Sequence, residues 1–309
     1  MKDILIGVDA GGTKTVAAAY TPDGTLIATQ SGAAGNVAAD PDAASRAIID
    51  TIKALLTHIE GLFSASLPLL CVGAAGVSRG GEILTRALDS AFEGRFDRIC
   101  VISDAELALH AAHGGEDGLL LIAGTGSIGY RKSGSTLYRA GGWGHLLGDE
   151  GSAWAIARAA ICTVLQATDR GLPAPEPLWH AIAAQLQIGT PQALLSYVYS
   201  HPKADVAALC RAVTQCADGG DPLALRILQQ AGEALADLAQ ELVSRAPCQE
   251  KLPLAISGGV LRHCTHVRTA LERAASEKKL PLSHIISADE PTRGVLAFYR
   301  NMTNGGLLL

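Results

Sequence analysis

Short apolar runs separated by turns dominate the first part of the chain. Residues 4–10, 15–21 and 25–32 form three such runs, and a turn containing glycine separates each from the next. This pattern predicts a meander of antiparallel strands. Over 40–59 the apolar positions recur at helical spacing, which predicts an amphipathic helix.

The pattern then changes to buried strands and helices in alternation. Strands are expected at 68–78 and 98–105, a helix at 80–92 between them, and a second helix at 105–113. A glycine-rich joint at 113–118 follows.

After the joint the opening pattern returns. Residues 120–132 repeat the strand, Gly/Thr turn and strand of residues 5–20, which predicts two similar lobes around one cleft. A strand at 252–257 leads into a glycine turn and a helix, and a helix at 291–301 closes the chain. Further helices are expected at 151–167, 176–187, 191–200, 203–217 and 222–246.

Composition narrows the class of protein. The 309 residues are 48% hydrophobic and 18% charged, which excludes a disordered chain and allows a large core. A net charge of −5 without a basic block argues against nucleic acid or an anionic membrane as partner. No apolar run is long enough to span a bilayer, and the N-terminus lacks a signal-peptide pattern. Seven cysteines without a C-x-x-C pair indicate a reducing compartment, so we expect a cytoplasmic protein.

Three glycine turns follow apolar strands and are candidate phosphate sites. They are Gly11-Gly12-Thr13-Lys14, Gly124-Thr125-Gly126-Ser127 and Gly258-Gly259. Glycine lets backbone N–H groups approach an anion closely, and the hydroxyls add donors. The first turn does not match a P-loop, because its spacing differs and a strand follows. Ordinary hairpin turns remain the alternative.

Two aspartates lie at strand ends. Asp9 precedes the first glycine turn, where a carboxylate beside phosphates could hold Mg²⁺ through water, or could only stabilise the turn. Asp104 follows a strand and could accept a proton from a substrate hydroxyl. The alternative is a helix start, because Ser103 and Glu106 fit a capping box around Asp104.

The segment "GGWGHLLGDEGSAW", residues 141–154, combines flexibility with unusual side chains. Asp149 and Ser152 could cap the helix that follows, but a turn requires neither Trp143 nor His145. An indole face with hydrogen-bonding groups suits a polar ring, such as a carbohydrate.

Six segments together carry a family resemblance. "GVDAGGTKT", "SDAELAL", "AGTGSIGY", "GGWGHLLGDEGSAW", "GDPLA" and "ISGGV" resemble the N-acetylglucosamine kinase family, in order and over nearly the whole chain. That family belongs with the ATPases related to the BadF/BadG/BcrA/BcrD activators of benzoyl-CoA reductase and 2-hydroxyacyl-CoA dehydratase. The resemblance implies an α/β, actin/hexokinase/Hsp70-like (ribonuclease H-like) fold with ATP and sugar in a cleft between two lobes. The expected N-terminal lobe is 1–113 plus 290–309, and the C-terminal lobe is 114–289.

The resemblance also implies roles for individual residues. The activity would be ATP-dependent phosphorylation of the 6-hydroxyl of an amino sugar, with Mg²⁺, and N-acetylglucosamine as the expected substrate. Asp104 would deprotonate that hydroxyl, and Thr13 and Thr125 would contact phosphates. The adenosine side would be formed by Gly258, Gly259 and the stretch near Ala217. The sugar positions would be Asn36, Trp143, Gly144, His145 and Asp149.

Alternatives stay open within and beyond this family. Glucosamine or N-acetylmuramic acid could be the substrate, although glucosamine kinases tend to lack the Trp-Gly-His arrangement. The loop at 73–81 is a candidate contact for an N-acyl group. A dehydratase activator would need paired cysteines for an iron–sulfur cluster, and a sugar-sensing regulator would need a DNA-binding module ahead of the first strand. Homodimers are common among similar kinases.

Overall fold

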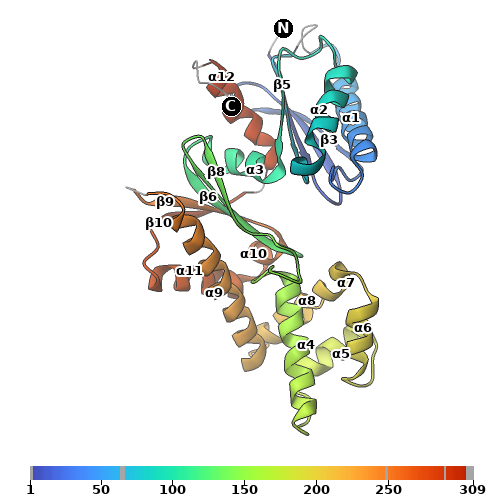
Figure 1. Ribbon diagram of the computed structural model, residues 1–309, viewed down its shortest axis with the longest axis vertical. Helices are drawn as coiled ribbons and strands as arrows, with labels where there is room; N and C mark the ends of the chain where they lie inside the picture. Colours follow the sequence, from blue (N-terminus) through green and yellow to red (C-terminus); the bar gives the residue numbers. More distant parts are fainter. Residues whose placement is uncertain (1–2, 63–66, 248–249, 289, 304–309) are drawn as a thin grey trace. The chain divides into compact units, whose positions relative to one another are not determined.

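The chain forms two compact units, each with its own sheet (Figure 1). The computed structural model describes residues 3–62, 67–247, 250–288 and 290–303. Unit 1 comprises Met1–Gly118, Lys132–Leu137 and Ala288–Leu309, and unit 2 comprises Leu119–Arg131 and Tyr138–Ser287. Each unit is described by itself below.

The sheet of unit 1 has the order β3-β2-β1-β4-β5. Strands β1 (Leu5–Ala10), β2 (Thr15–Tyr20) and β3 (Leu26–Gly32) form the predicted antiparallel meander. Strand β4 (Leu69–Ala74) pairs in parallel with β1, and β5 (Ile99–Ser103) pairs in parallel with β4. The carboxyl ends of β1, β4 and β5 therefore meet at one edge of the sheet.

Helices cover both faces of this sheet. Helices α1 (Pro41–His58) and α2 (Val77–Ala91) pack on the face that contains Ile6 and Val8. Leu5 points to the other face and packs with residues of α3 (Asp104–His113) and α12 (Gly294–Thr303). Successive residues of β1 and β4 alternate between two covered faces, which explains why these two strands are almost wholly apolar.

The C-terminal segment lies directly on β1. The 3₁₀ turn η1 (Pro291–Arg293) precedes α12, and a Cβ at Gly7 would lie 2.0 Å from the carbonyl oxygen of Thr292. A Cβ at Gly294 would likewise lie 2.4 Å from the carbonyl oxygen of Leu107. Only glycine permits these approaches of one backbone to another.

The sheet of unit 2 has the order β10-β9-β6-β7-β8, so read from β8 it repeats the strand order of unit 1. The strands are β6 (Gly118–Ala123), β7 (Ser127–Ser133), β8 (Thr136–Gly141), β9 (Leu252–Ser257) and β10 (Leu282–Ser287). The predicted repetition of the opening pattern is confirmed. The sequence interpretation missed β10, whose mixture of polar and apolar residues did not stand out as a strand.

Eight helices complete the described part of unit 2. They are α4 (Ala153–Asp169), α5 (Leu178–Leu186), α6 (Ala193–Ser200), α7 (Lys203–Ala207), α8 (Cys210–Asp218), α9 (Pro222–Ser244), α10 (Gly259–His263) and α11 (Thr265–Glu277). The prediction of one helix over 203–217 is wrong, because α7 and α8 are separate. At the joint the Leu209 and Arg211 N–H groups donate to carbonyls only three residues back, which interrupts the α-helical pattern.

A buried arginine joins β7 to the end of α9. Arg131 is 1% exposed, and its guanidinium donates to the carbonyl oxygens of Val243 at 2.6 Å, Ala246 at 2.8 Å and Pro247 at 3.0 Å. These oxygens belong to the end of a helix and the turn after it, where carbonyls lack intrahelical partners. Arg131 thus compensates the negative end of the longest described helix.

The length and hydropathy of the described helices show whether any of them could span a membrane. None of them is both long and apolar enough to cross a bilayer.

Candidate active site

Asp9 and Asp104 lie at strand ends on the same edge of the unit 1 sheet, with β4 between their two strands. Asp9 is near the end of β1, and Asp104 opens α3 directly after β5. Burial, the largest cause, and the nearby Asp104 charge raise the pKa of Asp9 to about 6, although the Lys14 charge lowers it. Two carboxylates that share a partly buried edge form a site that favours a proton or a cation.

Asp104 is not needed as the helix cap. The cap of α3 is Ser103, whose hydroxyl accepts the Glu106 N–H at 3.1 Å. The Asp104 carboxylate accepts the adjacent Ala105 N–H at 2.9 Å, and burial raises its pKa despite backbone hydrogen bonds. A basic carboxylate is therefore available for proton transfer.

The first glycine turn is tight and open to solvent. The Gly11 N–H donates to the Lys14 carbonyl at 3.0 Å, while Gly12, Thr13 and Lys14 are exposed. The Gly11 carbonyl accepts the Gly35 N–H at 2.9 Å, which ties the turn to the segment that carries Asn36.

Asn36 lies where the β1 and β4 ends meet the start of α2. Its Oδ1 accepts the Ala38 N–H at 3.0 Å, and the Val37 N–H donates to the Ala75 carbonyl at 2.9 Å. Gly76 has a φ of 81°, and a Cβ there would lie 2.8 Å from Asn36 Oδ1. The prediction of a loop over 73–81 holds only for residues 75 and 76, because β4 ends at Ala74 and α2 begins at Val77.

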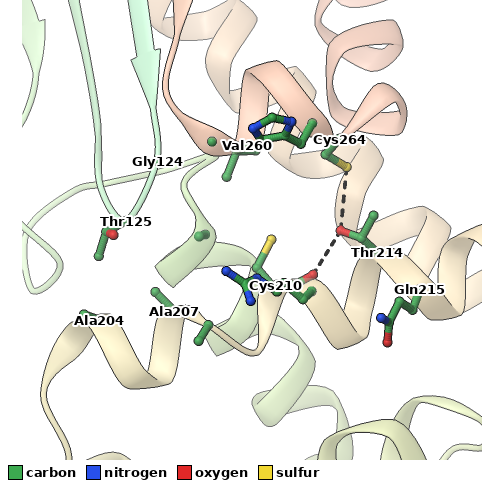
Figure 2. Close-up of a pocket in the computed structure, with 14 residues that line it drawn as sticks. Gly124, Thr125, Ala204, Ala207, Cys210, Thr214, Gln215, Val260 and Cys264 are labelled. Carbon is green, nitrogen blue, oxygen red and sulfur yellow. Dashed lines mark hydrogen bonds between the residues drawn. The ribbon is translucent and has the colours of Figure 1, made fainter. Parts of the chain in front are cut away.

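In unit 2 the second and third glycine turns abut. A Cβ at Gly258, whose φ is 88°, would lie 2.4 Å from the Ala123 carbonyl oxygen at the end of β6. Gly124, Thr125 and Gly259 line one cavity of about 590 Å³ (Figure 2). That volume suits a small-molecule ligand.

Helices α7 and α8 form the other wall of this cavity. Ala204 and Ala207 of α7 line it, as do Thr214 and Gln215 of α8. Ala217, the residue predicted for the adenosine side, is buried in the core of unit 2 and does not line it. Thr214 and Gln215 lie close to Ala217 on α8, and the sequence offered no signal that selected them.

The loop between β8 and α4 is fastened to the second glycine turn. Asp149 Oδ1 accepts the Ser127 N–H at 3.1 Å, and the Ser127 hydroxyl donates to the Glu150 carbonyl at 2.6 Å. The Ala153 N–H donates to the Gly124 carbonyl at 2.8 Å. Of the two predicted caps only Ser152 caps α4, because Asp149 is buried with a φ of 69° and bonds Ser127 and Lys203 instead.

The same loop presents its indole to solvent. Trp143 is 67% exposed, and the Arg139 guanidinium carbon lies 4.5 Å from the centre of its ring. Gly144 beside it has a φ of 83°. The His145 ring instead packs edge-on against Trp154, with centroids 4.7 Å apart. Trp143 is thus the side chain of this loop that is open to a ring-shaped ligand.

Comparison with known proteins identifies the family. Residues 6–296 match the BadF/BadG/BcrA/BcrD ATPase family. The chain belongs to this family. The predicted family relationship is thereby confirmed.

Two sugar kinases are similar to this chain over most of its length. An N-acetylmuramic acid/N-acetylglucosamine kinase of Clostridium acetobutylicum is 30% identical over 280 residues, which cover 85% of this chain and 87% of that protein. An N-acetyl-D-glucosamine kinase of Dictyostelium discoideum is 30% identical over 275 residues, which cover 84% of this chain and 85% of that protein.

A solved crystal structure shares the fold. It is that of an inferred N-acetylglucosamine kinase from Chromobacterium violaceum, with a TM-score of 0.73 and 28% identity over 96% of this chain and 98% of that one. The predicted two-lobe, hexokinase-like α/β fold class is confirmed.

Proposed function

We propose that the protein transfers the terminal phosphoryl group of ATP to the 6-hydroxyl of an amino sugar, with N-acetylglucosamine as the first candidate. One observation carries the proposal: within unit 2 the glycine turn that lines the cavity is hydrogen-bonded to the loop that bears Trp143. The kinase activities of the two relatives that are 30% identical support it.

ATP would lie in the cavity of unit 2. Thr214 and Gln215 would face the nucleoside, and Gly259 would approach it through its backbone. Thr125 and Gly126 would donate N–H groups to phosphate, and Gly11 to Lys14 would do so from unit 1. Membership of an ATPase family supports the choice of nucleotide.

Asp9 is the residue best suited to a magnesium ion. Within the described residues no group of three or more His, Cys, Asp or Glu side chains could hold a metal. Mg²⁺ fits this donor set, because it commonly binds one or two carboxylates together with substrate phosphates and water. The raised pKa of Asp9 also indicates that a cation there would be favourable. When bound, the ion would neutralise charge on the transferring phosphoryl group.

Asp104 would act as general base. Its carboxylate accepts the proton as the sugar oxygen bonds to the terminal phosphorus, and the bond from that phosphorus to the ADP oxygen breaks. The products are the sugar 6-phosphate and ADP. Burial raises the pKa of Asp104, which strengthens it as a base.

Each unit has candidate sugar-binding groups. Trp143 offers an apolar face, and Gly144, His145 and Asp149 belong to the same loop. Asn36 offers an amide on the edge of unit 1. Glucosamine and N-acetylmuramic acid are the alternatives within this reaction class.

A dehydratase activator is the second candidate class, and the described cysteines disfavour it. Burial raises the pKa of Cys71, Cys100, Cys210 and Cys216, which disfavours the thiolates that a cluster requires. Cys248 lies outside the described residues.

An ADP-release assay with Mg²⁺ tests the proposal directly. N-acetylglucosamine, glucosamine, N-acetylmuramic acid and glucose are supplied separately, with water alone as the control. We expect N-acetylglucosamine to give the highest kcat/KM. Release at the rate of the water control with all four sugars would rule the proposal out.

A further inference from the structure

A lysine without a predicted role lies against the second glycine turn. Lys203 is the first residue of α7, and its Nζ lies 2.5 Å from Asp149 Oδ2. A Cβ at Gly126 would lie 2.9 Å from the same Nζ, so the ammonium lies directly beside the backbone of the turn. The turn, the buried carboxylate and the ammonium therefore form one cluster.

The two ends of this ion pair differ in accessibility. The Asp149 side chain is buried, and its other oxygen accepts the Ser127 N–H. The Lys203 side chain is 28% exposed. An ammonium has three N–H donors, and Asp149 accepts one of them, so the group can also bind a ligand from solvent.

The cluster adjoins one end of the cavity of unit 2. Ala204 follows Lys203 and lines the cavity, as does Thr125, which precedes Gly126. Figure 2 shows Thr125 and Ala204 on the left of the pocket and Gln215 on the right. A nucleoside near Gln215 would direct its phosphates toward Thr125 and the Lys203 ammonium.

We propose that Lys203 binds the polyphosphate chain of the nucleotide, an inference that rests on the proposed use of ATP. A lysine ammonium is a compact cation that forms charge-assisted hydrogen bonds with phosphate. The hydrogen bond to Asp149 holds it at the turn before the nucleotide arrives. The alternative role is that of a counter-ion for Asp149 alone.

Binding of adenosine and ADP separates these two roles. Calorimetry on the full chain with Mg²⁺ and no sugar compares the wild type with Lys203→Gln. We expect ADP affinity to fall at least about tenfold and adenosine affinity to change less than about twofold, because only ADP carries the phosphates.

Lys278→Gln is the matched control. Lys278 pairs with Asp237 at 2.8 Å and is 33% exposed, but it directly follows α11 and does not line the cavity. We expect both of its affinities to match the wild type. Equal losses of ADP and adenosine affinity in Lys203→Gln, or unchanged ADP affinity, would overturn the proposal.

A double variant covers the case in which Lys203→Gln does not fold. Asp149→Asn combined with Lys203→Gln removes the buried charge together with its counter-ion. A counter-ion role predicts that this variant binds ADP as the wild type does, whereas phosphate binding predicts that ADP affinity stays at least about tenfold weaker.

The calorimetric test of Lys203 uses no sugar, so its outcome can be distinguished from that of the ADP-release assay for the proposed function. Failure of the kinase proposal appears as no sugar-dependent ADP release. Failure of the Lys203 proposal appears as an unchanged ratio of ADP to adenosine affinity. A wild type that binds neither ligand would overturn both.

Discussion

Folding of unit 1 disfavours the ionised form of the Asp9 carboxyl group. Its pKa is about 6 in the fold against 3.8 ordinarily, chiefly because of burial. The protonated form is thus favoured by folding, and its stabilising contribution is complete below pH 3.8 and lost as the pH rises through about 6. At pH 7.5 the ionised carboxylate costs up to about 3 kcal/mol.

Asp9→Asn should therefore stabilise the protein at pH 7.5 and lower its Mg²⁺-dependent activity. The gain in unfolding free energy should shrink toward pH 4, where Asp9 is protonated in the fold. Denaturant unfolding at both pH values checks this, with the exposed Asp89→Asn on α2 as control. A variant less stable than the wild type at pH 7.5 would contradict the electrostatic account.

Asp104→Asn should remove the general base and leave the helix cap, which is Ser103. We expect kcat to fall by about 10²–10⁴-fold while ATP still binds. Single-turnover kinetics and nucleotide titration measure the two effects. Retention of more than about a tenth of the wild-type kcat would exclude the role of base.

Candidate site residues could be selected from the sequence where local pattern and chemistry coincide. Asp9 and Asp104 stand out because they lie at the ends of apolar strands. Lys203 did not stand out, because its partner Asp149 is 54 residues away along the chain. Ala217 lies on the same helix as the cavity-lining Thr214 and Gln215, but its side chain is buried in the core, because side-chain direction on α8 depends on packing that a sequence does not show.

Arg131 determines how β7 and the end of α9 are joined. Arg131→Met should lower the unfolding free energy by about 3 kcal/mol or more, because several carbonyls lose their buried donor. Urea denaturation measures this loss. Arg273→Met, which removes an exposed ion-paired arginine of α11, should change it by less than about 1 kcal/mol. Equal effects of the two variants would refute the capping role.

The exposed Trp143 in the loop between β8 and α4 leads to a prediction about sugar binding. Trp143→Ala should raise KM for the sugar at least about tenfold and KM for ATP less than about twofold, because the exposed indole is expected to contact the sugar alone. Steady-state kinetics with each substrate varied in turn measures both constants. Tyr199→Ala on α6, also exposed, is the control. Equal changes in both KM values would remove Trp143 from the sugar site.

At the scale of elements, the bounds of helices and strands could be predicted where apolar positions repeat regularly, and not where the repeat is weak. The opening meander and α9 were predicted closely, since their apolar positions repeat regularly. The break between α7 and α8 was not, because no proline or glycine marks Ala208 or Leu209. Helix α2 starts earlier than predicted, since Val77 and Ser78 continue an apparent strand pattern.

At the scale of the whole molecule, the two sheets repeat one strand order, and each carries a glycine turn after its first strand. Hydrogen exchange should therefore separate the ligand responses of the two units. AMP and ATP with Mg²⁺ should both protect the Gly124–Ser127 turn and α8, because the residues that line the nucleotide cavity all belong to unit 2. Protection limited to unit 1 with either ligand would contradict the assignment of the nucleoside to unit 2.

The contact of Gly7 with Thr292 has a consequence for biosynthesis. The ribosome makes β1 to β5 early, yet α12, which covers part of one sheet face, is made only after all of unit 2. At about 5–20 residues per second, Leu5 and its apolar neighbours wait for some tens of seconds without that cover. The nascent chain is thus most exposed to aggregation, and most dependent on chaperones, before its last helix leaves the ribosome.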